Sequence, residues 1–276
     1  MSTPSNPSQT LAFIGGGNMA SAIIGGLIKQ GTPAKSILVV EPFEEARQRL
    51  QTQFGVRILA AADTTLAKAG MVIWAVKPQT FKDAAQQTHD FCTNALHLSV
   101  AAGIRSDSIA NWLGTERVVR AMPNTPALVG LGQTGLFARA AVTSADKSWI
   151  EQVIATTGAL LWVAEEPLLD AVTAISGSGP AYVFFFIEAM VEAGVKMGLT
   201  AAQATQLAIG TFEGASQLAK SASEPPSVLR ERVTSKGGTT YAALTSMQEA
   251  HVGELFQTAL KAAQHRAREL GNEFGV

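Results

Sequence analysis

An alternation of apolar and helical segments runs from Leu11 to about Val163, and it restricts the possible folds of this chain more than any other feature. The apolar segments are short and hydrophobic throughout, as expected of strands buried on both faces of a sheet. They read LAFIG, SILVVE, VRIL, MVIWAV, LHLSVAAG, RVVRAM, TGLFA and ALLWV. Between them lie helix-like segments at Ser21–Gln30, Phe43–Gln53, Gln79–Phe91 and Ser144–Thr156. The pattern predicts an α/β fold with a doubly wound, Rossmann-like parallel sheet.

The pattern changes after about Glu165, where alanine-rich segments with helical spacing replace the strands. We therefore expect a first domain at residues 1–165, with a loose polar tail at 1–10, and an all-α domain at 166–276. Residues 183–187 are consecutive apolar residues, so their helix needs burial on several sides and predicts a dimerisation surface. The expected helices are Pro180–Met197, Ala201–Lys220, Thr239–Glu249 and Gly253–Leu270.

The composition excludes several classes of protein. A net charge of -1 gives no electrostatic reason to expect nucleic acid or an anionic membrane as a partner. Cys92 is the single cysteine, so an intrachain disulfide is impossible. The polar first residues do not resemble a signal peptide, and Glu188 and Glu192 interrupt the most apolar run before it reaches the length of a membrane span. We expect a soluble, cytoplasmic protein.

The first strand leads into a glycine turn with the spacing Gly15-x-Gly17-x-x-Ala20, followed by a helix. In this pattern Gly15 permits the tight turn and Gly17 lets the backbone approach a pyrophosphate. The helix N-terminus at Asn18 and Met19 offers free amides to the phosphates. The context of strand, turn and helix predicts a dinucleotide site.

Glu41 ends the second predicted strand, where an acidic residue usually accepts hydrogen bonds from the adenosine ribose and repels a 2′-phosphate. That position favours NADH, whereas Arg47 and Arg49 on the following helix favour a phosphate. The alternative is an ordinary surface glutamate. The residues by themselves leave the choice between NADPH and NADH open.

Later strands also end in small residues at the edge where open α/β sheets bind ligands. For Lys77, a solvated lysine and a direct contact with the cofactor are equal alternatives. Trp74 and Met122 are expected to be packing residues. The expected cofactor-binding residues at these ends are Ala75, Val76, Lys77, Pro78, Ala102 and Asn124.

Common catalytic groups are missing from the sequence pattern. The four histidines form no pair with metal-ligand spacing, and His97 within a strand is expected to be structural. The segment Ser176–Tyr182, SGSGPAY, fits a site wall and a helix start equally well. A substrate that is already electrophilic tolerates the lack of a strong general acid, and a protonated imine is such a substrate.

A second glycine turn, VTSKGGTTYAAL, extends from Val233 to Leu244. Gly237 and Gly238 permit a backbone whose amides point outward, and a helix beginning at Thr239 or Thr240 favours an anion at its start. The alternative is a threonine N-cap after a loop, which is common.

These motifs together resemble the pyrroline-5-carboxylate reductase family. The resemblance covers nearly the whole chain after the polar tail and includes FIGGGNMASAIIGGL, AVKP, AAG, RAMPNTPA, SGSGPAY and GVKMGL in the family's order. The family signature is matched by Pro226, Leu229, Val233, Thr234, Ser235, Gly237, Gly238, Thr240, Ala243, Leu244 and Met247.

The resemblance implies reduction of 1-pyrroline-5-carboxylate to L-proline with NADPH, with NADH possible, as the last step of proline biosynthesis. It implies that the Thr240 hydroxyl contacts the ring nitrogen, and that the substrate carboxylate is held by backbone at Ser235, Gly237, Gly238 and Thr239. It also implies a homodimer whose two subunits share each site, and dimers that assemble into a larger ring.

Two positions depart from the family pattern, since Glu41 stands where small or polar residues are common and Lys236 replaces a frequent proline. Two other functions are alternatives. One is an NAD(P)-dependent reductase of another cyclic imine or of a keto acid, of the β-hydroxyacid dehydrogenase type, for which Lys196 is the candidate acid–base group. The other is a non-catalytic nucleotide sensor, which needs only one anion site.

Overall fold

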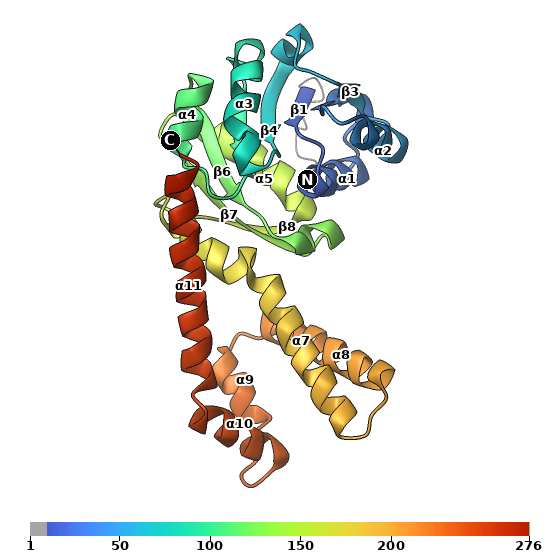
Figure 1. Cartoon of the computed structure of the whole chain (residues 1–276), viewed down its shortest axis with the longest axis vertical. Coiled ribbons are helices and arrows are strands. Elements are labelled where there is room, and N and C mark those ends of the chain that lie inside the picture. The colour runs from blue at the N-terminus through green and yellow to red at the C-terminus, as the bar shows by residue number, and fades with distance from the viewer. Residues whose placement is uncertain (1–9, 276) are drawn as a thin grey trace. The chain divides into compact units, whose positions relative to one another are not determined.

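The computed structural model describes residues 10–275 and divides them into two compact units (Figure 1). The first unit contains the described residues up to Ser178 together with those from Ala263 onward, and the second contains Gly179–Ala262. The end of the last helix thus belongs with the first unit, although we expected it in the second domain. Of the expected polar tail, residues 1–9 lie outside the described residues, and Thr10 is the first residue of a strand.

The described residues of the first unit form an eight-stranded sheet with the order β3-β2-β1-β4-β5-β6-β7-β8. Each of the eight predicted strands is present. Their bounds are β1 Thr10–Ile14, β2 Ile37–Val40, β3 Arg57–Leu59, β4 Ala69–Trp74, β5 Leu96–Ser99, β6 Val118–Met122, β7 Gly132–Ala138 and β8 Gly158–Trp162.

The predicted doubly wound sheet is confirmed, and it is parallel except at β7, which pairs antiparallel with β6. The cause is the connection between them, residues 123–131, which holds a 3₁₀ turn at Thr125–Val129. A parallel pair needs a crossover of about a dozen residues or more, and this segment is too short for one. β8 again pairs parallel with β7, because a full helix connects the two strands.

Helices flank this sheet, and alternate strand residues point into two separate apolar cores. Phe13, Ile37 and Ile73 belong to one core, whereas Leu38 and Trp74 belong to the other. Burial of each large side chain stabilises the fold by about 1.5–3 kcal/mol, so two filled faces account for the doubly wound form. The helices are α1 Asn18–Lys29, α2 Glu44–Phe54, α3 Pro78–Thr88, α4 Ser106–Leu113, α5 Ser144–Ile154 and the short α6 Leu168–Val172. We did not predict α4 or α6.

The second unit consists of helices, as predicted. α7 and α8 pack closely because Gly194 faces Ala204, where a Cβ on the glycine would stand 2.9 Å from the alanine Cβ. At the start of α11, Phe256 makes edge-to-face contacts with Tyr182 and Phe186 of α7. The helices are α7 Gly179–Lys196, α8 Ala201–Ser221, α9 Pro226–Arg232, α10 Thr239–Glu249 and α11 Val252–Glu273, of which the last ends in the first unit. α9 was not predicted.

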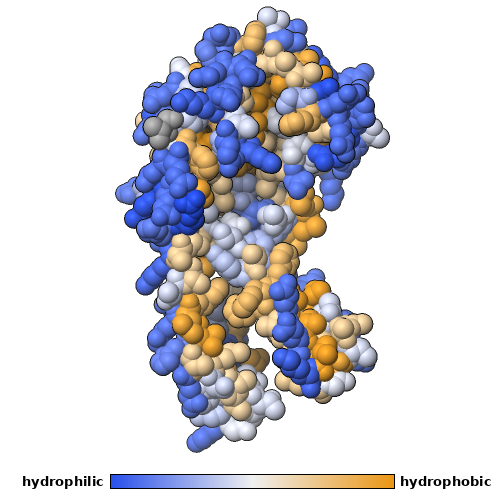
Figure 2. Space-filling view, in the orientation of Figure 1, coloured by the Kyte–Doolittle hydropathy of each residue, from blue (hydrophilic) through white to orange (hydrophobic). Residues whose placement is uncertain are grey.

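α7 and α8 leave much apolar surface exposed within a single chain (Figure 2). The exposed large side chains include Val183, Phe184, Phe185 and Met190 of α7 and Leu207, Ile209 and Leu218 of α8. One helical segment, Leu168–Lys196, is long and apolar enough to cross a membrane by length and composition alone. Our exclusion of a span on the basis of Glu188 and Glu192 was therefore too strict, although a core helix of a water-soluble protein passes the same test.

Candidate active site

The expected cofactor-binding residues lie at one edge of the sheet in the first unit. The register pairs Ile14 with both Val40 and Trp74, and it pairs Trp74 with Ser99. The carboxyl ends of β1, β2, β4 and β5 therefore stand side by side, and β6 follows in parallel. This arrangement gathers Gly15, Gly17, Asn18, Met19, Glu41, Ala75, Val76, Lys77, Pro78, Ala102 and Asn124 at the ligand-binding edge of an open α/β sheet.

Gly15 makes the tight turn that the sequence predicts. Its φ is +93°, and an added Cβ would stand 2.6 Å from the Ala75 carbonyl oxygen and 3.1 Å from Val76 Cγ1. A side chain at this position is both strained and obstructed. The first glycine turn thus rests directly on the segment that follows β4.

Gly17 is the N-cap of α1, and an added Cβ there would meet no described atom within 4 Å. No side chain within residues 10–275 caps this helix start. The amides of Asn18 and Met19 are therefore available, and the positive end of the helix faces the open space. The open glycine and the uncapped helix fit a pyrophosphate group.

Glu41 is buried, with only 6% of its surface exposed, so the alternative of an ordinary surface glutamate was wrong. Its Oε2 accepts a hydrogen bond from the Gly16 amide at 2.8 Å, and its Oε1 accepts one from the Phe43 amide at 3.0 Å. Arg49 donates to the Gly16 carbonyl oxygen at 2.9 Å, and Arg47 donates to the carbonyl oxygens of Glu41 and Pro42. All three side chains thus make hydrogen bonds to backbone groups.

Asn124 and Lys77 occupy different environments at the same edge. Asn124 is buried, and its side chain donates to the Ser176 carbonyl oxygen at 3.0 Å and accepts from the Gln133 amide at 2.9 Å. It thereby holds the end of β6 against a π-helical turn at Thr173–Gly177. Lys77 is exposed and precedes α3, which begins with Pro78. Contact of either residue with a cofactor stays a prediction.

His97 and Cys92 are buried in the first unit, as structural residues would be. The Nδ1 atom of His97 accepts a hydrogen bond from Trp74 Nε1 at 3.1 Å. Burial, with Arg117 as a lesser cause, lowers the pKa of His97 to about 4 against a smaller opposing effect of the Cys92 backbone. Burial also raises the pKa of the Cys92 thiol to about 11. Among the described residues, no three His, Cys, Asp or Glu side chains lie close enough together to bind a metal ion.

The second glycine turn lies in the second unit and leads into α10. Gly237 has a φ of +76°, and the Gly238 amide donates to the Ser235 carbonyl oxygen at 3.0 Å. An added Cβ on Gly238 would stand 2.6 Å from Ser235 Oγ, a contact that a change of the serine rotamer relieves, so the positive φ of Gly237 is the feature that favours glycine in this turn. Gly238 itself is the N-cap, so the alternative of a threonine N-cap was wrong.

No side chain of the described chain caps α10, and Thr239 and Thr240 are its first two residues. The Thr240 hydroxyl has no hydrogen-bond partner within the described residues. The start of α10 therefore combines free amides with a hydroxyl that is available to a ligand. This is the same arrangement of glycines and helix start that the first unit shows at α1.

Sequence reasoning missed a largely buried network of side-chain ion pairs, which joins the segment around α6 to α4 and β6. Arg105 makes a bidentate ion pair with Asp170, with distances of 3.0 and 2.9 Å. Arg120 donates to Glu166 at 2.6 Å, and the amide of Ser106 donates to the same carboxylate at 2.6 Å. These partners are far apart in sequence, and single charges carry no signal of their pairing. The network fixes the segment that precedes α6 to α4 and β6.

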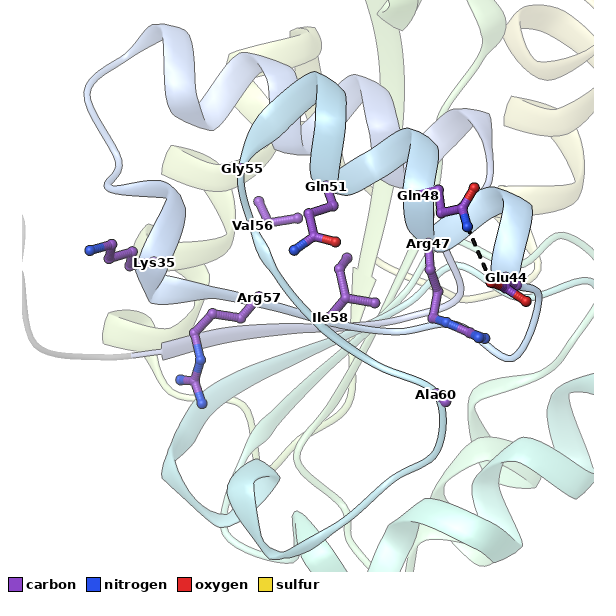
Figure 3. A pocket seen from close by; sticks show the side chains of 10 residues that line it. All are labelled: Lys35, Glu44, Arg47, Gln48, Gln51, Gly55, Val56, Arg57, Ile58 and Ala60. Carbon is purple, nitrogen blue, oxygen red and sulfur yellow. Dashed lines mark hydrogen bonds between the residues drawn. The ribbon is translucent and has the colours of Figure 1, made fainter.

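A cavity of about 580 Å³ between α2 and β3 was also missed (Figure 3). Arg47 and Glu44 lie at one end of it, and Lys35 and Arg57 lie at the other. The remaining lining residues are Gln48, Gln51, Gly55, Val56, Ile58 and Ala60. Three cations and one carboxylate give this cavity a positive net charge, with Lys35 and Arg57 beside the starts of β2 and β3 and Arg47 beyond the end of β2.

Comparisons with known proteins agree over both units. Residues 166–270 match the family described as pyrroline-5-carboxylate reductase dimerisation, and residues 10–103 match the family described as NADP oxidoreductase, coenzyme F420-dependent. The pyrroline-5-carboxylate reductase of Pseudomonas aeruginosa is 43% identical over 277 residues and covers 100% of both chains. That of Vibrio alginolyticus is 39% identical and covers 96% of this chain and 99% of its own.

Solved structures give the same result. The pyrroline-5-carboxylate reductase of Coxiella burnetii superposes with a TM-score of 0.89 at 37% identity, over 95% of this chain and 98% of that one. The pyrroline carboxylate reductase of Plasmodium falciparum, solved with NADP bound, superposes with a TM-score of 0.85 at 27% identity, over 96% and 99% of the two chains.

Proposed function

The chain belongs to the pyrroline-5-carboxylate reductase family, and we propose that it reduces 1-pyrroline-5-carboxylate to L-proline with NADPH, the last step of proline biosynthesis. The observation that carries this proposal is the extent of the match, because a relative of that name is 43% identical over the entire chain. That span includes both glycine turns and the helix that each one opens.

For the cofactor, the proposal assigns the pyrophosphate to the amides at Gly17, Asn18 and Met19, where a Cβ at Gly17 would fill open space. NADPH is the expected donor and NADH a possible one. When bound, the nicotinamide supplies a hydride to the substrate. The strand ends at Ala75–Pro78, Ala102 and Asn124 are proposed to line the remainder of the cofactor site.

For the substrate, the proposal assigns the carboxylate to the backbone between Ser235 and Thr239, at the uncapped start of α10. The Thr240 hydroxyl oxygen accepts a hydrogen bond from the N–H of the protonated ring nitrogen, and so holds the C=N bond in one orientation. As the imine carbon gains a hydride, the C=N π electrons move to the nitrogen, which keeps its proton. The product is a secondary amine, so the residues need to orient the ring more than to move protons.

We propose a homodimer in which each site takes its nucleotide domain from one subunit and its α10 turn from the other, with dimers assembled into a larger ring. The match to a dimerisation family and the exposed apolar faces of α7 and α8 support an assembly of this kind. Covering those faces with a second copy also favours an enzyme of the cytoplasm over a membrane protein.

A reduction assay tests the proposed reaction directly. The purified chain is mixed with NADPH or NADH, and the decay of cofactor absorbance is followed after addition of 1-pyrroline-5-carboxylate. We expect rapid decay with NADPH, slower decay with NADH, and little decay with a six-membered cyclic imine acid or a β-keto acid. Decay with the keto acid alone would favour a hydroxyacid dehydrogenase, and no decay with any substrate would refute the proposed activity.

A further inference from the structure

We propose that Glu41 and Arg49 position the glycine turn of the cofactor site, and that Glu41 does not recognise the adenosine ribose. This inference rests on the proposed use of a dinucleotide, and it assigns a role to two side chains at the end of β2 and on α2. It reverses the usual role of an acidic residue at this position, which is to bind the ribose hydroxyls.

Two hydrogen bonds hold the peptide groups on either side of the Gly16 Cα atom. Glu41 Oε2 accepts from the Gly16 amide at 2.8 Å and thereby fixes the peptide between Gly15 and Gly16. Arg49 donates to the Gly16 carbonyl oxygen at 2.9 Å and thereby fixes the peptide between Gly16 and Gly17. The second of these peptides carries the Gly17 amide, which belongs to the group that faces the proposed pyrophosphate.

Gly16 leaves the space that the contact with Glu41 needs. An added Cβ on Gly16 would overlap the Leu50 side chain and would stand 3.2 Å from Glu41 Oε2. The Glu41 carboxylate can therefore approach the backbone of the turn this closely because Gly16 has no side chain. A charge-assisted hydrogen bond in this buried setting orients the amide more firmly than a bond to water does.

Because of these hydrogen bonds, Glu41 is not available to bind the ribose. Its other oxygen accepts from the Phe43 amide at 3.0 Å, and only 6% of the residue is exposed. A carboxylate with both oxygens turned onto the backbone offers little to a ribose hydroxyl. NADPH and NADH differ only at the 2′ position of that ribose, so a residue that shapes the pyrophosphate site affects both cofactors alike.

Isothermal titration calorimetry without substrate tests this role, with NADPH and NADH as the probes. The variants are Glu41→Gln, Arg49→Met and, as a matched control, Glu45→Gln, which changes an exposed carboxylate on the same helix. In Glu41→Gln the new NH₂ group meets one of the two backbone amides donor to donor, so one bond is lost. We expect Glu41→Gln and Arg49→Met to weaken both cofactors by roughly tenfold and by the same factor.

The remaining results separate positioning from other roles. In steady-state kinetics the KM for NADPH should rise by about the same factor as the dissociation constant in both variants, whereas Glu45→Gln should keep the values of the parent chain. A change in the ratio of the NADPH and NADH affinities would overturn the inference, because it would make Glu41 a reader of the 2′ position. Unchanged affinity for both cofactors in both variants would overturn it too.

If Glu41→Gln does not fold, Arg49→Met still tests the proposal, because Arg49 is exposed and contacts the same turn from the solvent side. If only the proposed reaction is wrong, the result is different: the parent chain binds NADPH in calorimetry but does not oxidise it when the imine is added. A parent chain that binds neither cofactor would refute both proposals.

Discussion

Among single residues, Thr240 has the most specific proposed task, because it is the side chain assigned to the reacting end of the substrate. It is the second residue of α10 and follows Thr239, which comes directly after the turn made by Gly237 and Gly238. Its position next to free amides means that one short segment holds both the carboxylate and the imine nitrogen of a small ring. A single hydroxyl then decides the orientation of the C=N bond.

Replacing Thr240 with alanine should therefore lower kcat with 1-pyrroline-5-carboxylate by roughly tenfold to a thousandfold. The NADPH affinity should change little, because the cofactor is assigned to the other unit. Steady-state kinetics and calorimetry measure the two quantities separately. Ser246→Ala, an exposed substitution on the same helix, is the control. A rate equal to that of the parent chain would remove Thr240 from the mechanism.

His97 makes the stability of the first unit depend on pH. Its pKa is lowered from 6.5 to about 4 in the folded chain, chiefly by burial, so the unfolded chain binds more protons between these two values. Stability is then greatest above pH 6.5 and falls as the pH drops toward 4. The difference between the two pKa values corresponds to about 3 kcal/mol.

Urea unfolding at several pH values tests this dependence. The parent chain should lose about 3 kcal/mol between pH 6.5 and pH 4 through His97, in addition to what its carboxylates contribute. His97→Gln should remove that part of the slope, whereas His265→Gln, at an exposed histidine, should keep it. Equal slopes in the parent chain and His97→Gln would show that burial of the imidazole has no such cost.

At the level of elements, the close approach of β7 and β8 depends on two glycines. Gly158 has a φ of +143°, and an added Cβ would overlap the backbone of Gly132, the first residue of β7. The two strands are paired at this point, so the backbone on either side has little freedom to move. Neither the strain nor the overlap is relieved by a change of rotamer.

Gly158→Ala is therefore expected to lower the free energy of unfolding by about 3 kcal/mol. Gly114→Ala is the matched control, because Gly114 has a φ of +65° but no described atom within 4 Å of an added Cβ. That control carries backbone strain alone and should cost about 1 kcal/mol. Urea unfolding of both variants gives the comparison, and equal losses would mean that the overlap with Gly132 is unimportant.

The elements also explain which parts of the fold the sequence predicts. Long apolar runs such as MVIWAV reveal strands, because a buried strand needs such residues along its whole length. α4 and α9 escape prediction because helices of eight and seven residues are too short for a clear periodic pattern. The direction of β7 cannot be predicted from its own residues, because it depends on the length of the connection that precedes the strand.

The candidate site is likewise predictable only where its conformation is local. The spacing of Gly15 and Gly17 predicts the turn, since the required conformations are local. The orientation of Glu41 is not predictable from local sequence, because it depends on contact with Gly16, 25 residues away. The ion pair of Arg105 with Asp170 joins residues 65 apart and was missed for the same reason.

For the whole molecule, the exposed faces of α7 and α8 determine the expected assembly. Phe184, which is 60% exposed in a single chain, is one of several apolar side chains that need a partner surface. If a second copy covers this surface, each substrate site depends on the assembly, because the two turns of one site come from different subunits in the proposed enzyme.

Phe184→Glu should thus shift the protein toward monomer and lower kcat together with the fraction of dimer, because a charge buried in an apolar interface is costly. Size-exclusion chromatography with light scattering measures the mass, and the parent chain should elute as a dimer or a larger ring. Leu161→Glu, at an exposed leucine of the first unit, is the control. A fully active monomer of Phe184→Glu would contradict a site shared between subunits.

The central claim is that the first glycine turn holds a hydride donor and the second holds a cyclic imine. Its most direct test is the fate of deuterium carried at both C4 positions of the nicotinamide of NADPH, followed by mass spectrometry of the product. The account predicts L-proline with one deuterium on the ring carbon that was the imine carbon. Unlabelled proline, or deuterium in a product other than proline, would contradict it.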